Sequence, residues 1–347
     1  MSIALDVGVH RLRSLRRQDG RLLGRGCRTL YAALADTQSS RQLLGQMQIP
    51  YATCEDNLAV MGDAAAEFSR LLKVPSVSLL ANGKLPHDDP PARQIVGSLV
   101  EALIPEPRHP NEICCMTLPG ISSAQRSAGR RAYEFLTRLV KLRGYTPLVL
   151  ASSMAVILAE LVGESFTGIG LSLGAASCKV SLAHRGLELA CCSIPVGGNW
   201  IDEELALQNN DYAWDTSGNR YLDTESASQW KESLSRSILH PADAREQFLS
   251  NLYRELVAHV ATEAARNFAT VANVGDLPQP VSVVVEGGTA RIAGFGKLLE
   301  QIWRATPFPL ATKEFRVVAD SDYTVARGCL INAELESQTA AGRRSAA

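Results

Sequence analysis

Two adjacent glycines after a strongly apolar segment are the feature of this chain best suited to hold a ligand. Val281–Val285 is rich in β-branched residues, which is typical of a buried strand, and Gly287-Gly288 follows it. Because glycine has no Cβ, the backbone there can turn and lie close to a flat group before a helix begins near Gly296. We expect a nucleoside seat at this turn. The alternative is a strand-to-helix crossover that needs glycine only for packing.

Two other segments join a strand to a turn of small residues. Near the start of the chain, Ile3–Gly8 predicts a strand that ends in Asp6 and Gly8. In the middle, residues 166–182 predict a strand, a tight turn that contains Gly174 and Ser177, and a second strand. Ile194–Asp202 follows and contains the pair Gly197-Gly198. The order along the chain is therefore hairpin, hairpin, Gly-Gly turn.

This order of motifs recurs in one superfamily. The chain resembles the actin and heat-shock-chaperone ATPases, and among them it is most similar to the rod-shape-determining bacterial actins of the MreB type. The resemblance runs nearly end to end and includes Val60–Ala65, Leu85–Asp88, Ala92–Ile104, Met116–Gly120 and Val318–Gly328. It implies an α/β, two-lobed actin-like fold, built from duplicated ribonuclease-H-like domains, with a nucleotide cleft between the lobes.

The alternation of strand and helix patterns agrees with such a fold. Strands at Glu112–Leu118 and Pro147–Leu150 flank an amphipathic helix at Ser122–Leu142, which favours a largely parallel sheet with helices on it. The expected limits are 1–150 plus 323–336 for the first lobe, with a small subdomain at 35–75, and 151–322 for the second, with a small subdomain at 203–240 reduced to a helix or two. The small, polar tail at 337–347 is expected to be disordered.

The resemblance implies that the nucleotide-binding residues come from all of these turns. They are Asp6, Gly8, Gly174, Ser177, Gly197, Gly198, Lys231, Gly287, Gly288 and Thr289. Lys231 falls where the family places a base-contacting lysine, and a solvated helix charge is the alternative. Gly197-Gly198 also fits a simple helix-entry turn. ATP or ADP is the expected ligand, the need for Mg stays open, and no residue is assigned as catalytic or as a metal ligand.

Three departures from the family pattern concern the chemistry. The phosphate-binding hydroxyl of the first hairpin is replaced by Val9, and the acid that organises magnesium in the second is replaced by Ser172. The acid that positions the attacking water falls on Ser152, and a serine is a poor general base. Lys179 could neutralise phosphate charge but cannot bind a cation. Phosphoryl transfer depends on positioning and electrostatics, so we expect hydrolysis to be absent or very slow.

Other kinds of chemistry have less support. Gly170–Gly174 matches Gly-x-Ser-x-Gly, but the residues after it predict another strand rather than the helix of a nucleophile elbow, so Ser172 is not expected to be a nucleophile. The eight cysteines form no Cys-x-x-Cys pair, and we expect buried, reduced thiols. The six histidines are scattered, without the spacing of a zinc site.

Composition and charge describe an ordinary cytosolic protein. The formal net charge of -1 and the 46% of apolar residues argue against a dedicated nucleic-acid binder. No apolar run approaches the ~20 residues of a membrane span, and no signal peptide is predicted. Residues 1–30 are locally basic, which fits a solvated strand face or contact with an anionic partner such as a lipid surface or an acidic protein. These arginines are Arg11, Arg13, Arg16, Arg17, Arg21, Arg25 and Arg28.

The resemblance implies a cytoskeletal or scaffold subunit in cell-shape organisation. Such a protein would be cytoplasmic or membrane-associated, would self-associate and would have protein partners at the cell envelope. The reduced small subdomain predicts self-association that is weaker or geometrically different. The main alternative is a non-hydrolysing adaptor similar to the actin-fold platforms of type IV pilus assembly. An active ATPase or chaperone ranks last, because no peptide-binding domain follows the fold.

Overall fold

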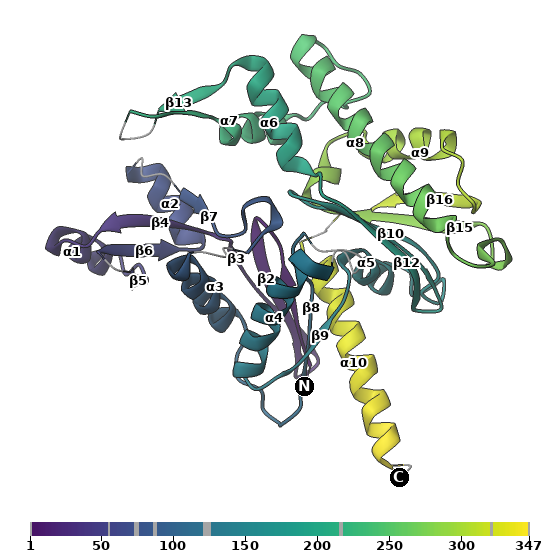
Figure 1. The fold of residues 1–347 in the computed structure, drawn as a ribbon, viewed down its shortest axis with the longest axis horizontal. Helices are drawn as coiled ribbons and strands as arrows, with labels where there is room; N and C mark the ends of the chain where they lie inside the picture. The colour runs from purple at the N-terminus through teal and green to yellow at the C-terminus, as the bar shows by residue number, and fades with distance from the viewer. Residues whose placement is uncertain are drawn as a thin grey trace.

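The chain forms two lobes joined through a layer of helices (Figure 1). The structure, a computed structural model, describes residues 2–54, 56–72, 76–85, 89–120, 126–214, 218–319 and 322–345. Each lobe holds one five-stranded mixed sheet and carries a small subdomain. The long C-terminal helix returns from the second lobe to pack against the sheet of the first. The fold is therefore the α/β, two-lobed arrangement expected from the sequence.

The sheet of the first lobe has the strand order β3-β2-β1-β8-β9. The antiparallel strands β1, β2 and β3 form a meander, and β8 and β9 run parallel to β1. The helix α4 is described from Arg126, so its expected start at Ser122 lies outside the described residues. The bounds are β1 (Ile3–Val7), β2 (Arg11–Gln18), β3 (Arg21–Arg28), β8 (Ile113–Met116), β9 (Thr146–Val149), α3 (Pro90–Leu103) and α4 (Arg126–Leu142).

The small subdomain of the first lobe is a four-stranded sheet in the order β5-β6-β4-β7. Apolar side chains of α1 and α2, among them Leu44 and Phe68, pack on this sheet and form a separate small core. Thr37 caps α1 by accepting a hydrogen bond from Ser40 N. The bounds are β4 (Leu30–Ala35), β5 (Tyr51–Cys54), β6 (Asn57–Met61), β7 (Ser76–Ser78), α1 (Gln38–Gln46), α2 (Asp63–Leu72) and the 3₁₀ turn η1 (Ala81–Gly83).

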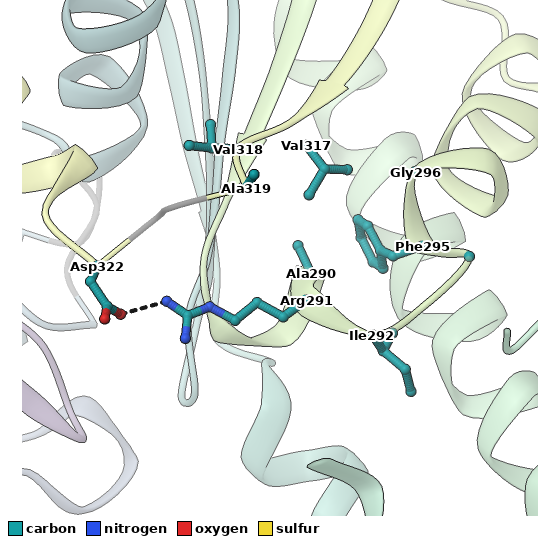
Figure 2. A pocket seen from close by; sticks show the side chains of 10 residues that line it. Ala290, Arg291, Ile292, Phe295, Gly296, Val317, Val318, Ala319 and Asp322 are labelled. Atoms are coloured by element: carbon teal, nitrogen blue, oxygen red, sulfur yellow. Dashed lines mark hydrogen bonds and ion pairs between the residues drawn. The ribbon is translucent and has the colours of Figure 1, made fainter. Parts of the chain in front are cut away.

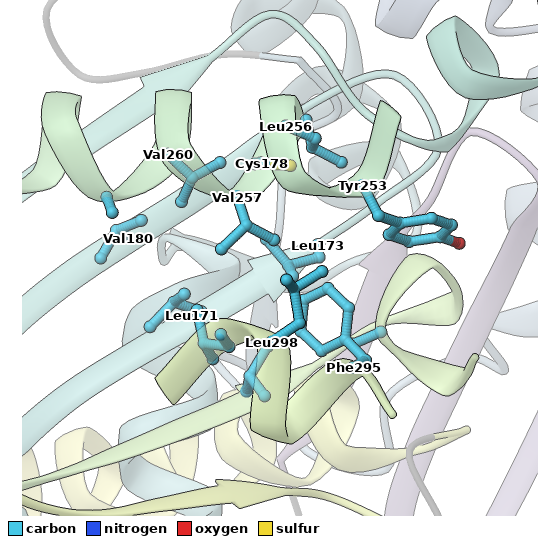
Figure 3. Close-up of a cluster of buried hydrophobic side chains, with 14 of the residues drawn as sticks. Leu171, Leu173, Cys178, Val180, Tyr253, Leu256, Val257, Val260, Phe295 and Leu298 are labelled. Atoms are coloured by element: carbon cyan, nitrogen blue, oxygen red, sulfur yellow. The ribbon is translucent and has the colours of Figure 1, made fainter. Parts of the chain in front are cut away.

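The sheet of the second lobe repeats the topology of the first, with the order β12-β11-β10-β15-β16. The helices α8 and α9 cover one face and bury apolar side chains such as Val257 and Leu298 against Leu171 and Val180 (Figure 3). This burial fixes the position of β10 and β15, whose ends carry the turns of interest. The bounds are β10 (Gly168–Leu173), β11 (Cys178–His184), β12 (Leu187–Ile194), β15 (Val281–Glu286), β16 (Thr312–Val317), α5 (Ser152–Glu160), α8 (Ala244–Phe268), η2 (Val274–Asp276), η3 (Gly288–Arg291) and α9 (Phe295–Ala305).

The small subdomain of the second lobe differs from the expectation of helices alone. Between α6 (Gly198–Asn209) and α7 (Thr224–Ser233), the strands β13 (Tyr212–Trp214) and β14 (Arg220–Leu222) pair as an antiparallel hairpin. The strands are three residues each and mostly exposed, so they leave no run of alternating residues to detect. The Arg220 guanidinium lies 3.7 Å from the ring centroid of Tyr212 and stabilises the hairpin across its strands.

The helix α10 (Thr324–Ser345) also corrects a prediction. It was expected to end at Glu336 before a disordered tail at 337–347, but the helix continues to Ser345. Alanine has the highest helix propensity, and this segment contains Ala340 and Ala341, which outweighs its polar composition. Near its start, Gly328 lies directly against the carbonyl of Ala155 on α5, where any Cβ would clash. The two helices are thus in close contact where the lobes meet.

Candidate functional site

The turn between β10 and β11 is held by the two Gly-Gly segments. The carbonyl oxygen of Gly174 accepts hydrogen bonds from Gly198 N at 3.1 Å and from Thr289 Oγ1 at 3.0 Å. Gly174 N donates to Ser177 O at 3.0 Å and closes the turn. Three turn segments that are far apart in the sequence therefore meet at one place.

The two glycines of the last turn have different surroundings. Gly287 has a φ of +117°, and a Cβ there would clash with the backbone of Leu173. A Cβ on Gly288 would meet nothing within 4 Å. Gly287 is therefore required by the fold, whereas the space beside Gly288 is open. The structural interpretation of the turn applies to Gly287, and the ligand-binding interpretation stays a prediction for Gly288.

The second Gly-Gly pair begins α6 and is tightly packed. A Cβ on Gly197 would clash with the carbonyls of Gly174 and Ala175, and one on Gly198 would lie 2.9 Å from Thr289 Oγ1. The pair is therefore the helix-entry turn of α6 and packs directly against the turn between β10 and β11.

Lys231 forms an ion pair with Asp202, with Nζ 2.6 Å from Oδ1. Both side chains are buried, so the alternative of a solvated helix charge is wrong. Burial raises the pKa of Asp202, and Lys231 opposes that rise. Because its ammonium charge already has a partner, Lys231 connects α7 to α6 below the site.

Asp6 and Gly8 lie in the first lobe, at the end of β1. Asp6 Oδ1 accepts a hydrogen bond from Thr117 Oγ1 at 2.8 Å, and Oδ2 lies 3.8 Å from Arg13. Burial raises the pKa of Asp6, while Arg13 and Thr117 act in the opposite direction. Gly8 N donates to Arg11 O at 3.0 Å and closes the first hairpin.

The second lobe contains a matching pair that the sequence analysis missed. Ser172 lies beside Glu286 in the parallel ladder, and its hydroxyl donates to Glu286 Oε1 at 2.6 Å. Burial raises the pKa of Glu286 to about 7, the hydrogen bond from Ser172 opposes this, and the negative charge of Asp6 adds to it. The sequence shows that Glu286 directly precedes the Gly-Gly turn. It does not show that Ser172 is its partner, because that depends on strand register. The acid missing at position 172 thus has a neighbour that carries one.

Two contacts join the lobes at the site. His10 Nε2 lies 3.1 Å from Asn199 Oδ1, which connects the first hairpin to the start of α6. Lys179 Nζ donates to Leu118 O at 2.6 Å, which connects β11 to the segment after β8. The turn residues of both lobes therefore face a common region.

The serines that depart from the family pattern lie at the start of α5 and on β10. Ser152 begins α5, and Ser153 Oγ lies 2.7 Å from Ser181 Oγ in the interior. Ser172 leads into a hairpin rather than a helix, so the Gly-x-Ser-x-Gly match is no nucleophile elbow, as predicted. No group of three or more His, Cys, Asp or Glu among the described residues could hold a metal ion. All eight cysteines are free thiols, four of them buried and four half-buried.

A cavity of about 570 Å³ lies beyond the last turn, between η3, α9 and the end of β16 (Figure 2). Ile292 and Phe295 contribute to an apolar lining, and Arg291 reaches Asp322 across one side at 2.5 Å. Arg291 lowers the pKa of Asp322 through this hydrogen bond. None of the predicted site residues lines this cavity, so it is adjacent to the predicted seat rather than identical with it.

Most of the arginines in residues 1–30 have partners. Arg11 and Arg28 lie near Asp63, Arg13 near Asp6, and Arg17 near Glu334, while Arg25 donates to a backbone carbonyl. Five of the seven arginines in this basic segment therefore have an acceptor within the chain, which favours the solvated strand face over contact with an anionic partner.

Comparisons with known proteins agree with this geometry. The volactin family model matches residues 1–333. MreB5 of Spiroplasma citri, solved with AMPPNP, has a TM-score of 0.67 at 15% identity and covers 98% of each chain. The MamK double helical filament also has a TM-score of 0.67, at 16% identity, over 96% of this chain and 99% of that one. EutJ from Carboxydothermus hydrogenoformans has a TM-score of 0.50 at 17% identity, over 95% and 89%.

These likenesses show that the fold is the two-lobed actin-like fold. A search of curated proteins finds no match. Among the described residues, no helix combines the length and the apolar character needed to cross a membrane.

Proposed function

This chain belongs to the volactin family, and from that premise we propose that it is a nucleotide-binding, MreB-like cytoskeletal or scaffold subunit. The observation that carries the proposal is the meeting of Gly174, Gly198 and Thr289 beside the open space at Gly288. MreB5 of Spiroplasma citri was solved with AMPPNP and with ADP, which supports ATP or ADP as the ligand. In this proposal the chain acts in the cytoplasm and contributes to the organisation of cell shape.

Nucleotide binding is tested with Gly288→Val. The new side chain enters the open space at Gly288 without displacing backbone, so it should block the ligand and leave the fold intact. A ligand at 100 times its Kd stabilises a protein by about 2.7 kcal/mol, which a thermal melt detects. We expect ADP and ATP to raise the melting temperature of the wild type and not of the variant.

The matched control is Gly163→Val, because a Cβ on Gly163 also meets nothing within 4 Å but lies after α5, far along the chain from the turn. This variant should respond to nucleotide as the wild type does. Equal stabilisation of the wild type and Gly288→Val, or none in either, would show that the turn holds no nucleotide.

Hydrolysis is proposed to be absent or very slow. Val9, Ser152 and Ser172 stand where the family pattern has functional groups. Near the start of α5, the acid Glu188 accepts a hydrogen bond from Ser181, whose hydroxyl also contacts Ser153. Phosphate release with ATP and magnesium should stay at the background rate. Steady release that disappears in Asp6→Ala would overturn this part of the proposal.

Self-association belongs to the same proposal, supported by the double helical filament of MamK. The second small subdomain consists of short elements around one two-stranded hairpin, so a contact that uses it should be smaller than a standard interface of about 1,600 Å². We expect weaker or geometrically different assemblies by light scattering and electron microscopy, with and without ATP. Ordinary nucleotide-dependent double filaments would contradict this expectation.

The second candidate is a non-hydrolysing adaptor with protein partners at the cell envelope. It is favoured by the exposed aromatic face of the β13–β14 hairpin, where Trp214 is 68% exposed beside Tyr212 and Arg220. Two results together would favour the adaptor: the protein stays a monomer at all concentrations tested, and replacing Trp214 by alanine abolishes binding of a protein partner. Peripheral membrane contact is the weaker variant, because most arginines of residues 1–30 are already paired.

A further inference from the structure

A buried lysine on β11 of the second lobe reaches across to the first lobe. Lys179 is 6% exposed and lies on β11 opposite Ser172, yet its ammonium donates to the carbonyl of Leu118 in the first lobe. Burial lowers the pKa of Lys179, while Asp6 acts against this. A buried cation is costly unless it is paired, so its place at the junction needs a reason beyond packing.

The ammonium group of Lys179 still has donor capacity. A lysine carries three N–H donors, and among the described residues the structure gives this one a single acceptor, Leu118 O. The turn between β10 and β11 runs from Gly174 to Ser177 and ends directly before β11, two residues before Lys179. Two donors on a positive group thus remain without an acceptor among the described residues, beside the turn that the proposed phosphates would contact.

The carboxylates of Asp6 and Glu286 are poorly placed to hold a divalent cation. Asp6 accepts a hydrogen bond from Thr117 and faces Arg13, and Glu286 accepts one from Ser172. Burial raises the pKa of both acids, and a metal needs them deprotonated. Among the described residues, no three such groups come together as a metal site. The donor set therefore does not fit a protein-bound magnesium ion.

We propose that Lys179 supplies the counter-charge for the phosphates of the bound nucleotide, so that this cleft binds ATP or ADP without a divalent cation. The inference rests on the proposed nucleotide site and names the group that neutralises the ligand there. A charge-assisted hydrogen bond from an ammonium to a phosphate oxygen is short and strong, and it does not require a second ion.

The test is calorimetric titration of the wild-type protein with ATP and with ADP, once in magnesium chloride and once in EDTA. The expected result is the same Kd in both buffers. Affinity that is lost in EDTA and restored by magnesium overturns the inference and leaves the proposed nucleotide site standing. No binding in either buffer overturns both, so the two failures are distinct.

Variants at Lys179 provide the second arm. Lys179→Met keeps the length of the side chain and removes the charge, and we expect the Kd to rise about 10- to 100-fold, as for loss of a hydrogen bond to a charged group. Lys179→Arg should retain part of the affinity. Lys313→Met, an exposed position on β16, is the matched control and should bind as the wild type does.

An unchanged Kd in a folded Lys179→Met protein would show that the lysine only joins the lobes. If that variant does not fold, the titrations of the wild type in magnesium and in EDTA still decide the question.

Discussion

The two lobes carry the same pair of groups at the ends of their central strands, in exchanged positions. In the first lobe the acid, Asp6, is on β1 and the hydroxyl, Thr117, follows the parallel neighbour β8. In the second lobe the hydroxyl, Ser172, is on β10 and the acid, Glu286, ends the parallel neighbour β15. The oxygen-to-oxygen distances are 2.8 and 2.6 Å.

The exchange shows that the sheet does not fix which of the two neighbouring strands carries the acid. Either arrangement satisfies a buried carboxyl with a hydroxyl donor, so the fold tolerates both. The acid of the second lobe comes from β15, the strand next to the expected one, so a carboxyl group lies beside Ser172 although position 172 itself has none.

The largest expected effect concerns the glycines that form the turns. Gly287→Val should cost roughly 3–5 kcal/mol of unfolding free energy, since its φ of +117° and the Leu173 backbone both exclude a side chain. Gly8→Ala in the first lobe should cost less, about 1–2 kcal/mol, since no positive φ is involved. Urea unfolding of both variants measures the difference, and equal costs would mean that the two turns are equally constrained.

The pH dependence of stability distinguishes the two acids. The pKa of Glu286 is about 7 in the folded chain against an ordinary 4.5, so the folded state binds this proton more tightly. Stability should therefore fall as pH rises from about 4.5 to about 7, by roughly 3 kcal/mol for this group. Glu286→Gln should flatten the profile obtained from urea unfolding across this range. If stability falls with pH equally steeply in Glu286→Gln, the pH dependence comes from other groups, of which Asp6 is the first candidate.

A double-mutant cycle tests whether the acid and the hydroxyl of the second lobe can be swapped between positions 172 and 286. Ser172→Asp alone places a second carboxylate beside Glu286 and should destabilise the protein by about 2 kcal/mol at pH 8. Adding Glu286→Thr recreates the arrangement of the first lobe, and we expect the pair to recover about 1–2 kcal/mol through their coupling. Additive costs would show that the acid must come from β15 for a reason other than this hydrogen bond.

The smallest effect is expected in the small subdomain of the second lobe. Trp214→Ala should change the melting temperature little, within about 0.5 kcal/mol of stability, since the ring is 68% exposed. Phe68 in the small subdomain of the first lobe is 1% exposed, and Phe68→Ala should cost roughly 3–5 kcal/mol. A stability loss for Trp214→Ala as large as that for Phe68→Ala would mean that the ring is buried in solution, for example by self-association.

The sequence was sufficient for most of the framework and for the turns. Val281–Val285 predicted β15 because apolar periodicity has a local cause, whereas the convergence of the Gly-Gly segments was expected only from the family resemblance. Strand register depends on residues far apart in the sequence. The sequence therefore could not predict that Ser172 pairs with Glu286 or that Lys179 donates a hydrogen bond to Leu118 O. The β13–β14 hairpin was missed because three-residue strands carry too little pattern.

The contact between α5 and α10 sets the mechanics of the molecule. With Gly328 seated against the carbonyl of Ala155, the two helices touch backbone to backbone and leave little room to slide. A rotation of one lobe against the other would therefore pivot near this contact. The small subdomains lie far from it (Figure 1), so such a rotation would move them further than any part of the chain near the contact.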